Sequence, residues 1–199
     1  IPHIVLPCGI CQRENAIEPF WRKAHRDKII FCYAGNIGEA HNDVFLLELI
    51  RQLDPEKHLI LLRLYGAKAR RVLDNISVFE SVIILDYIAP ADMQYIDICV
   101  ASLLPAWNHV CVPSKVVSAI CAGTPVLYNA NEESEGACMF PEAVWLIPDG
   151  NNMSVSIRQF LNRLPEETIH EKKVAARMYA AELIRQESEN QLHLLQLIK

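Results

Sequence analysis

The stretch KIIFCYAGNIGEAHNDVFLLELIRQLDPEKHLILLRLYG, residues 28–66, decides the fold. Its pattern predicts a buried strand at 28–35, a helix at 42–54 and a second buried strand at 58–66. Asn42 or Asp43 is the expected N-cap of that helix, because both side chains accept hydrogen bonds from free backbone N–H groups. Strands that are apolar throughout and joined by a helix predict parallel pairing in a sheet covered on both faces.

The same alternation continues along the chain. We expect a helix at 67–76, a strand at 81–88, a short helix from Pro90, a strand at 97–105, a helix at 113–122, a strand at 125–128, a short helix at 135–140, a strand at 143–147 and helix from Ser154 to the end. The pattern predicts an α/β fold, a Rossmann-like doubly wound parallel sheet of about six strands with helices on both faces. Ligands in such folds bind beyond the carboxyl ends of the strands, so the strand-to-helix loops are the expected site.

Composition narrows the class of protein. The 199 residues are 51% apolar and 22% charged, which is typical of a globular domain with a substantial core. The net charge of −5 argues against a general nucleic-acid binder. We expect no membrane span, because the sequence has no run of about 18 uncharged apolar residues. The seven cysteines, an odd number, favour reduced thiols in a cytoplasm over a disulfide framework, and no metal site is expected.

Three parts of the chain are expected. Residues 1–27 are interpreted as the end of a preceding N-terminal domain and an interdomain linker, because an apolar opening is followed by a polar, charged segment. Residues 28–165 form the Rossmann-like domain. Residues 166–199 form an amphipathic helix that packs on this domain or crosses back to the preceding one, through Ala176, Tyr179, Leu183, Leu192, Leu195 and Ile198.

Two short motifs in the first part carry little functional weight. Cys8 and Cys11 form a lone C-x-x-C, for which a chance spacing is favoured over zinc or redox chemistry. The basic run 22–26 is interpreted as a solvated linker rather than a contact with anionic lipid.

The loop YAGNIGEAHN, residues 33–42, follows the first strand. Gly35 and Gly38 either form a tight turn or let the backbone approach a ligand closely, and spacing alone leaves both interpretations open. The loop is not a G-x-G-x-x-G dinucleotide motif, and it lacks the G-K-[ST] of a P-loop. A dehydrogenase is therefore the least favoured function.

The segment VPSKVVSAICAGTPVL, residues 112–127, opens a helix with Pro113, whose missing N–H would have no partner there. A lysine at this end opposes the helix dipole unless an anion is bound. Backbone N–H groups, Ser114 and Lys115 converge at this point and predict a phosphate site. The alternative is a capped surface helix with a solvated lysine.

The acidic loop NANEESEGACM, residues 129–139, follows another strand. A structural interpretation makes Ser134 the cap of the next helix and places Glu135 in its first turn. In the functional interpretation, the carboxylates hold sugar hydroxyls.

Taken in order, YAGNIGEAHN, LYG, VPSKVVSAICAGTPVL and the ESEG loop resemble the C-terminal, donor-binding domain of retaining nucleotide-sugar glycosyltransferases with the two-domain GT-B fold. They look most like the bacterial enzymes that build O-antigen, capsule and exopolysaccharide. The resemblance covers the chain from about Lys28 to the last helix, and the LPCGI turn resembles the junction between the two domains. Its motifs are specific as a set, although each alone is weak.

The resemblance implies a role for each matching residue. Gly35, Asn36 and Gly38 match the glycine loop beside the donor diphosphate. Gly66 matches a glycine that lines the nucleoside pocket, and Tyr87 and Ile88 match the residues that hold the base. The remaining matches are the diphosphate-binding segment Ser114, Lys115 and Val116 and the sugar-contacting loop Glu133, Ser134 and Glu135.

The sequence departs from the family at one point. Many relatives carry two glutamates with seven residues between them, and the corresponding positions here are Val110 and Ser118. The second glutamate usually holds the ribose hydroxyls, which puts ribose binding at this position in doubt. Ser118 can still supply one hydrogen bond.

The resemblance implies transfer of a hexose from a nucleoside diphosphate sugar, by family frequency a UDP-sugar, to a glycan or lipid-linked acceptor. Lys115 is the expected catalytic residue, because it stabilises the departing diphosphate, and neither a metal nor another cofactor is required. The acceptor would bind the missing N-terminal domain, so the chain alone is expected to bind donor weakly and to transfer nothing. The expected location is the cytoplasm, with peripheral association of the full-length enzyme at the inner face of the plasma membrane.

Two further functions stay open. One is a non-catalytic domain that binds a nucleotide sugar or a partner, which the missing glutamates favour. The other is a GT-B-like nucleotide-sugar epimerase, which would need catalytic acids and histidines that the sequence does not place.

Overall fold

The structure, a computed structural model, describes residues 17–76, 78–107 and 114–197. The predictions made for Cys8, Cys11, Val110 and Pro113 lie outside the described residues. Six strands form one sheet: β1 (Ile29–Asn36), β2 (His58–Tyr65), β3 (Val82–Ile84), β4 (Ile98–Ser102), β5 (Val126–Asn129) and β6 (Val144–Ile147).

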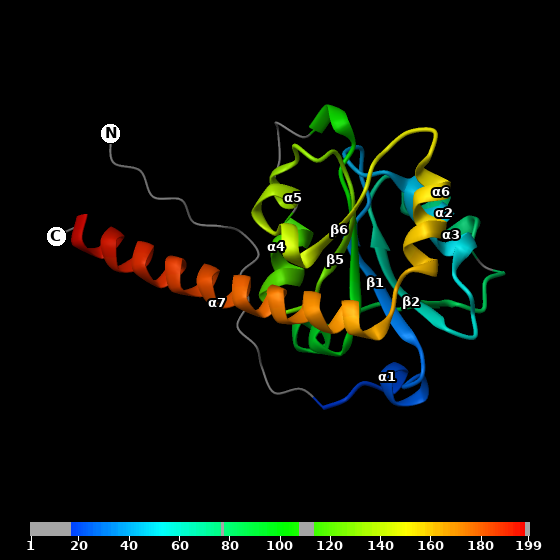
Figure 1. The fold of residues 1–199 in the computed structure, drawn as a ribbon, viewed down its shortest axis with the longest axis horizontal. Coiled ribbons are helices and arrows are strands. Elements are labelled where there is room, and N and C mark those ends of the chain that lie inside the picture. The colour runs from blue at the N-terminus through cyan, green and yellow to red at the C-terminus, as the bar shows by residue number, and fades with distance from the viewer. Residues whose placement is uncertain (1–16, 77, 108–113, 198–199) are drawn as a thin grey trace.

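All neighbouring strands pair in parallel, in the order β3-β2-β1-β4-β5-β6 (Figure 1). The predicted doubly wound parallel sheet is therefore confirmed. The chain order reverses between β1 and β4, which places the topological switch point at the carboxyl ends of these two strands.

Helices cover both faces of the sheet (Figure 1). The helices α2 (Asp43–Gln52), α3 (Ala69–Asp74) and α6 (Met153–Asn162) pack on one face, and α4 (Ser114–Cys121) and α7 (Glu166–Leu197) pack on the other. A short α5 (Glu135–Met139) and the 3-10 helices η1 (Pro90–Tyr95), η2 (Pro105–Trp107) and η3 (Pro141–Ala143) complete the connections. Each face has its own cluster of buried apolar side chains, as expected for strands buried on both sides.

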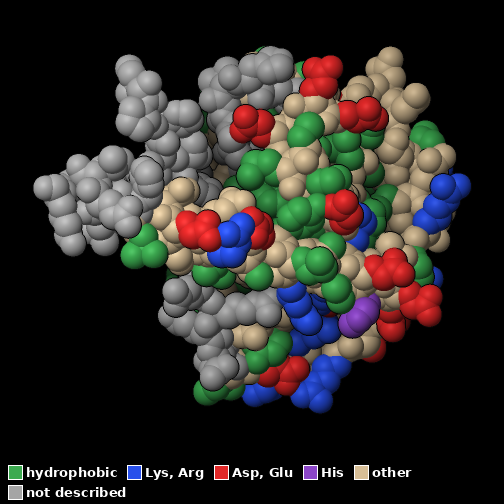
Figure 2. All heavy atoms as spheres, turned by 60° about the vertical axis from the view of Figure 1, so that its left-hand side comes forward, with side chains coloured by type: hydrophobic (Ala, Val, Ile, Leu, Met, Phe, Trp, Pro, Cys, Tyr) green, Lys and Arg blue, Asp and Glu red, His purple; other side chains and the backbone are tan. Residues whose placement is uncertain are grey.

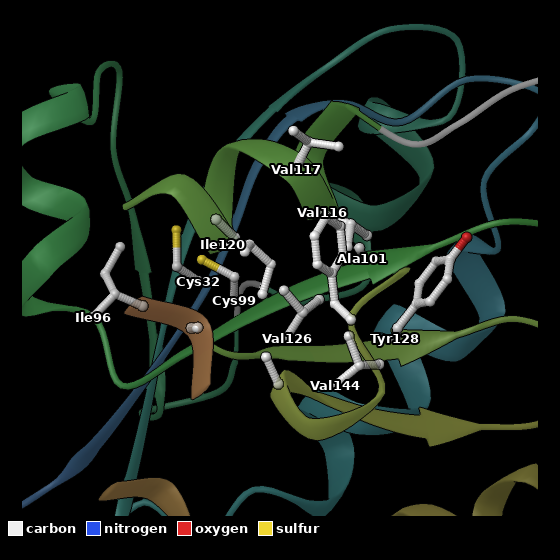
Figure 3. Packing of buried hydrophobic residues seen from close by; sticks show 14 of the residues in the cluster. Cys32, Ile96, Cys99, Ala101, Val116, Val117, Ile120, Val126, Tyr128 and Val144 are labelled. Atoms are coloured by element: carbon white, nitrogen blue, oxygen red, sulfur yellow. The ribbon is translucent and has the colours of Figure 1, made fainter. Parts of the chain in front are cut away.

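The packing under α4 prepares the site. Cys32 and Cys99 are register partners in β1 and β4 and lie side by side beneath Ile120 of α4 (Figure 3). Val116 and Val117 of α4 belong to the same cluster of buried residues (Figure 3). With these residues buried, the opposite stripe of α4 is free to face the carboxyl edge of the sheet.

Several predicted element boundaries need correction. β3 ends at Ile84 rather than at residue 88, because after Leu85 the edge strand no longer follows β2. The helix predicted from Ser154 to the end is interrupted between α6 and α7, where Pro165 has no N–H to continue it. Asn42 is confirmed as the N-cap of α2, since its side chain accepts a hydrogen bond from the backbone N–H of Phe45 at 3.1 Å.

The segment interpreted as a linker contains a short helix, α1 (Phe20–Ala24). Trp21 on α1 is only 2% exposed and belongs to the core on the α4 face. Arg22 forms an ion pair with Asp97 at 3.0 Å. The described part of this segment is therefore packed on the domain.

Helix α7 packs through Ala176, Tyr179 and Leu183, as its pattern predicts, and extends beyond the body of the domain (Figure 1). Leu192, which the pattern placed on the same apolar stripe, is 62% exposed.

On the face seen in Figure 2, apolar side chains gather between acidic and basic ones, so the described residues there form no uniformly basic surface. Within the described ranges, no helix is long and apolar enough to cross a membrane. Likewise, no group of three or more His, Cys, Asp or Glu side chains among the described residues could hold a metal ion. The described cysteines are all free, and Cys32, Cys99 and Cys121 are buried.

Candidate functional site

A cavity of about 510 Å³ opens at the carboxyl edge of the sheet, at the switch point between β1 and β4. The residues that line it come from β1, from the end of β2, from the segment after β3, from β4 and from one face of α4. They are Cys32, Ala34, Gly35, Asn36, Tyr65, Ile88, Pro90, Met93, Cys99, Val100, Ser114, Lys115, Ser118 and Ala122. This is the position at which open α/β sheets bind their ligands.

Gly35 lets β1 and α4 approach each other closely. Its φ of +125° is unfavourable for other residues, and a Cβ there would lie 3.1 Å from Cε of Lys115. The aliphatic part of the Lys115 side chain therefore packs against the backbone of Gly35 near the end of β1.

Lys115 is held at the cavity by three contacts. Its Nζ donates a hydrogen bond to the carbonyl oxygen of Asn36 at 2.7 Å, lies 2.9 Å from Nε2 of His41, and is 5.4 Å from the ring centre of Tyr33. Burial lowers the pKa of Lys115 to about 8. Among the recorded ion pairs of the described residues, none includes this lysine, so its charge lacks a protein counter-ion there.

His41 is fixed by the glycine loop. The backbone N–H of Gly38 donates to its Nδ1 at 3.1 Å. Burial first, and then the positive charge of Lys115, lowers the pKa of His41 to about 4, so the ring is neutral near pH 7.

A buried polar network fixes the helix that follows this loop. The backbone N–H of Asn42 donates to the Ser102 hydroxyl at 3.0 Å. Its side-chain amide donates to Asn129 at 2.9 Å and to Asp149 at 3.0 Å. These hydrogen bonds connect the start of α2 to the ends of β4, β5 and β6. The end of the loop that contains His41 is therefore fixed in position.

Gly66 supports the same loop from β2. Its φ is +103°, and a Cβ there would lie 1.9 Å from Oδ1 of Asn36. The Asn36 side chain therefore occupies the space that only glycine leaves free, while its carbonyl oxygen binds Lys115.

The structure brings together most of the residues singled out in the sequence. Gly35, Asn36, Ile88, Ser114, Lys115 and Ser118 line the cavity. Gly38 and Gly66 lie outside the cavity lining. The backbone N–H of Gly38 donates to His41, and Gly66 leaves space for the side chain of Asn36. Val116 is fully buried in the core, so only its backbone can face a ligand.

Other singled-out residues do not reach the cavity. Tyr87 is 67% exposed and lies outside the cavity lining. Glu133 and Glu135 are exposed outside this cavity, and Ser134 is fully buried. Ser134 stands at the N-cap of α5, where its carbonyl accepts from Ala137 and Cys138, but the hydroxyl makes no cap hydrogen bond, contrary to the prediction.

Two contributors were not predicted as site residues. His41 lies in a loop expected to face the cleft, where the sequence favours a solvated histidine, but in the structure it contacts Lys115. Tyr65 lines the cavity, and the guanidinium carbon of Arg63 lies over its ring, 4.9 Å from the ring centre. Its place at the end of a buried strand, directly before Gly66, is a signal that could have identified it.

No protein-family model matches the sequence, and no curated protein matches it significantly. Solved structures do resemble the fold. Anabaena HepE in complex with UDP and glucose has a TM-score of 0.63 at 12% identity, over 88% of this chain and 51% of that one. A S. aureus TarM mutant in complex with Fondaparinux, alpha-GlcNAc-glycerol and UDP has a TM-score of 0.62 at 16% identity, over 93% of this chain and 37% of that one.

The N-terminal domain of Candida albicans trehalose-6-phosphate phosphatase is also similar, with a TM-score of 0.57 at 12% identity, over 89% of this chain and 43% of that one. This chain thus spans about half the length, or less, of these three structures. At such identities the likeness establishes the fold alone, a Rossmann-like α/β domain.

Proposed function

We propose that this chain is the donor-binding domain of a retaining glycosyltransferase. It binds a nucleoside diphosphate sugar, with UDP as the nucleotide, whose hexose passes to a glycan or lipid-linked acceptor in bacterial surface polysaccharide synthesis. A second GT-B domain supplies the acceptor site, and the complete enzyme works in the cytoplasm, in peripheral contact with the membrane.

The observation that carries the proposal is the position of Lys115. Its Nζ lies at the switch-point cavity, at the start of α4 and against the Asn36 carbonyl, without a recorded ion pair among the described residues. The backbone N–H groups at a helix start and a partly buried cation together favour a phosphate. The UDP present in the HepE and TarM structures makes UDP the first nucleotide to test.

The same arrangement suits the chemistry of transfer. Negative charge builds on the diphosphate as its bond to the sugar breaks. A lysine and backbone N–H groups fixed at that point stabilise the transition state more than the ground state, with no metal required. Lys115 is therefore the proposed catalytic residue, and Ser114 and Ser118 are the proposed hydroxyl contacts to the donor.

Calorimetric titration of this chain with UDP tests the proposal. We expect binding, and Lys115→Ala should weaken it about 10- to 100-fold, the value of one charge-assisted hydrogen bond. Lys57→Ala is the matched control, because Lys57 is an exposed lysine directly before β2, at the opposite edge of the sheet, and forms an ion pair with Asp54 at 3.4 Å. Absence of UDP binding, or equal affinity in Lys115→Ala and wild type, would refute the assignment.

A non-catalytic nucleotide-sugar-binding domain is the second candidate. Ser118 favours it, because this cavity residue stands where many relatives carry a glutamate that holds the ribose. Both functions predict UDP binding. They differ in the complete protein, where Lys115→Ala abolishes sugar transfer only if the domain is catalytic.

A further inference from the structure

The hydrogen bonds around His41 fix which of its nitrogens carries the proton. The backbone N–H of Gly38 can only donate, and it lies 3.1 Å from Nδ1, so Nδ1 is the acceptor. A neutral imidazole has one N–H, which must then be on Nε2. The ring therefore presents a donor to whatever lies beside Nε2.

Beside Nε2, at 2.9 Å, lies Nζ of Lys115. An ammonium has three donors and no lone pair, so it would set donor against donor at this distance. A free amine has a lone pair that accepts from Nε2–H, and it keeps an N–H for the Asn36 carbonyl at 2.7 Å. Only the amine satisfies all of these contacts at once.

We propose that His41 is a positioning residue for Lys115 that stabilises the free amine relative to the ammonium in the empty site, and that binding of a diphosphate reverses this effect, so that Lys115 takes up one proton. The proton comes from solvent: an O–H or N–H bond of hydronium or of the buffer acid breaks as one N–H bond forms at Nζ. The ammonium of Lys115 then no longer accepts from Nε2–H of His41 and donates a hydrogen bond to a phosphate oxygen instead. This inference rests on the proposed function, because the donor diphosphate is the anion that binds.

The surrounding groups favour the same state. Lys68 donates to the carbonyl of His41 at 2.8 Å and is the nearest further cation, so it opposes a second charge on the pair. Lys68 itself forms an ion pair with Asp43 at 3.6 Å, and Asp43 forms a second ion pair with Arg71 at 3.0 Å.

Three buried titratable groups near Lys115, among the described residues, keep their protons near pH 7. Burial raises the pKa of Tyr33 and of Cys32, and raises that of Cys99 to about 12. Neither this phenol nor these two thiols therefore supplies a negative charge that would favour the ammonium of Lys115 in the absence of ligand.

Two substitutions separate the role of His41 in the loop from its contact with Lys115. In His41→Asn, the side-chain oxygen replaces Nδ1 and keeps the Gly38 bond, but nothing replaces Nε2. In His41→Gln, the longer side chain brings an oxygen to Lys115, where it accepts from the ammonium. Both variants should raise the pKa of Lys115 toward its ordinary value, since neither presents a donor to Nζ.

The first measurement is an NMR titration of the ¹³Cε resonance of Lys115 in the free chain, assigned by its loss in Lys115→Arg. We expect a midpoint near pH 8 in the wild type. In His41→Asn the midpoint should rise by one pH unit or more. A Lys115 midpoint in the ordinary range of about 10.4, or one that His41→Asn leaves unmoved, overturns the inference.

The second measurement is calorimetry of UDP binding at pH 9 in buffers of different ionisation enthalpy, which counts protons. Uptake should approach one proton in the wild type and should be at most about half a proton in His41→Asn, where a midpoint at or above pH 9 already leaves Lys115 at least half protonated. UDP binding without proton uptake overturns this inference and leaves the proposed function standing. Absence of UDP binding overturns the proposed function, while the NMR titration still decides the inference.

Discussion

Gly66 shows how a single residue holds the site together from outside it. Its φ of +103° and the Asn36 oxygen 1.9 Å from an added Cβ make alanine doubly unfavourable there. Gly66→Ala should move Asn36 and with it the carbonyl that binds Lys115. We expect a loss of about 2–4 kcal/mol in the free energy of unfolding, measured by urea denaturation, together with weaker UDP binding.

Gly150→Ala is the matched control for this substitution. Gly150 has a similar φ of +118°, but an added Cβ would meet nothing within 4 Å. The Gly150→Ala variant should lose only about 1–3 kcal/mol in the free energy of unfolding, which is the cost of backbone strain, and should keep the wild-type affinity for UDP. If the two variants lose equal stability and both bind UDP normally, then Asn36 is not positioned by Gly66.

At this scale, part of the site is predictable from sequence. Lys115 could be found, because a lysine at a helix start is electrostatically unusual in the absence of an anion. Its partner His41 could not, because that contact depends on how the loop between the two glycines folds back. Local patterns of residue type do not encode this path, and histidines in loops are common.

At the scale of elements, Asp97 joins two helices to the sheet at the amino edge. One oxygen accepts from the backbone N–H of Ile30 at 2.9 Å and from Arg22 of α1 at 3.0 Å, and the other accepts from Lys173 of α7 at 2.6 Å. Asp97→Ala leaves a buried N–H and two partly buried cations without their acceptor. The free energy of unfolding should fall by about 3–5 kcal/mol in urea denaturation.

Two variants calibrate this loss. Asp97→Asn keeps an acceptor for Ile30 and the same volume, so it should lose less than Asp97→Ala. Asp74→Ala removes an exposed pair with Arg70 at 3.7 Å and should cost under about 1 kcal/mol. A loss in Asp97→Ala no larger than that in Asp74→Ala would show that Asp97 does not anchor α1 and α7.

The elements themselves differ in how well sequence predicts them. The strands β1 and β2 are continuous apolar runs, and their parallel pairing follows from the helix between them. Helix α1 was missed, because a five-residue helix with one buried face has too few apolar positions to show a period. Trp21 is its main apolar contribution, and a single tryptophan in a polar segment is a weak signal of burial.

At the scale of the molecule, the site results from topology more than from any one motif. The strand order reverses between β1 and β4, so the connections leaving these strands diverge to opposite faces and leave the carboxyl edge open. The glycine loop after β1 and the start of α4, far apart in sequence, meet across this opening. Sequence could therefore predict that the loops share an edge, but the contacts between them depend on how α2 and α4 pack on their faces.

Helix α7 makes a separable contribution to the whole molecule. Its buried contacts with the domain include Ala176 and Leu183 and an edge-to-face contact between Tyr179 and Phe140, with ring centres 5.3 Å apart. Among the described side chains from 184 to 192, none is buried, and this part of the helix extends away from the body (Figure 1). Among the described side chains of α7, the buried ones thus lie in the part of the helix up to Leu183.

Shortening the chain from its end tests this division. Removal of residues 187–199 should change the midpoint of thermal unfolding by no more than about 2–4 °C, the equivalent of 1 kcal/mol in a domain of this size. Removal of residues 175–199 should abolish cooperative unfolding, because it uncovers the apolar face of α4 and the core beneath it. Circular dichroism measures both. A large loss from the shorter deletion would mean that the outer half of α7 folds back onto the domain, in contradiction to its exposed side chains.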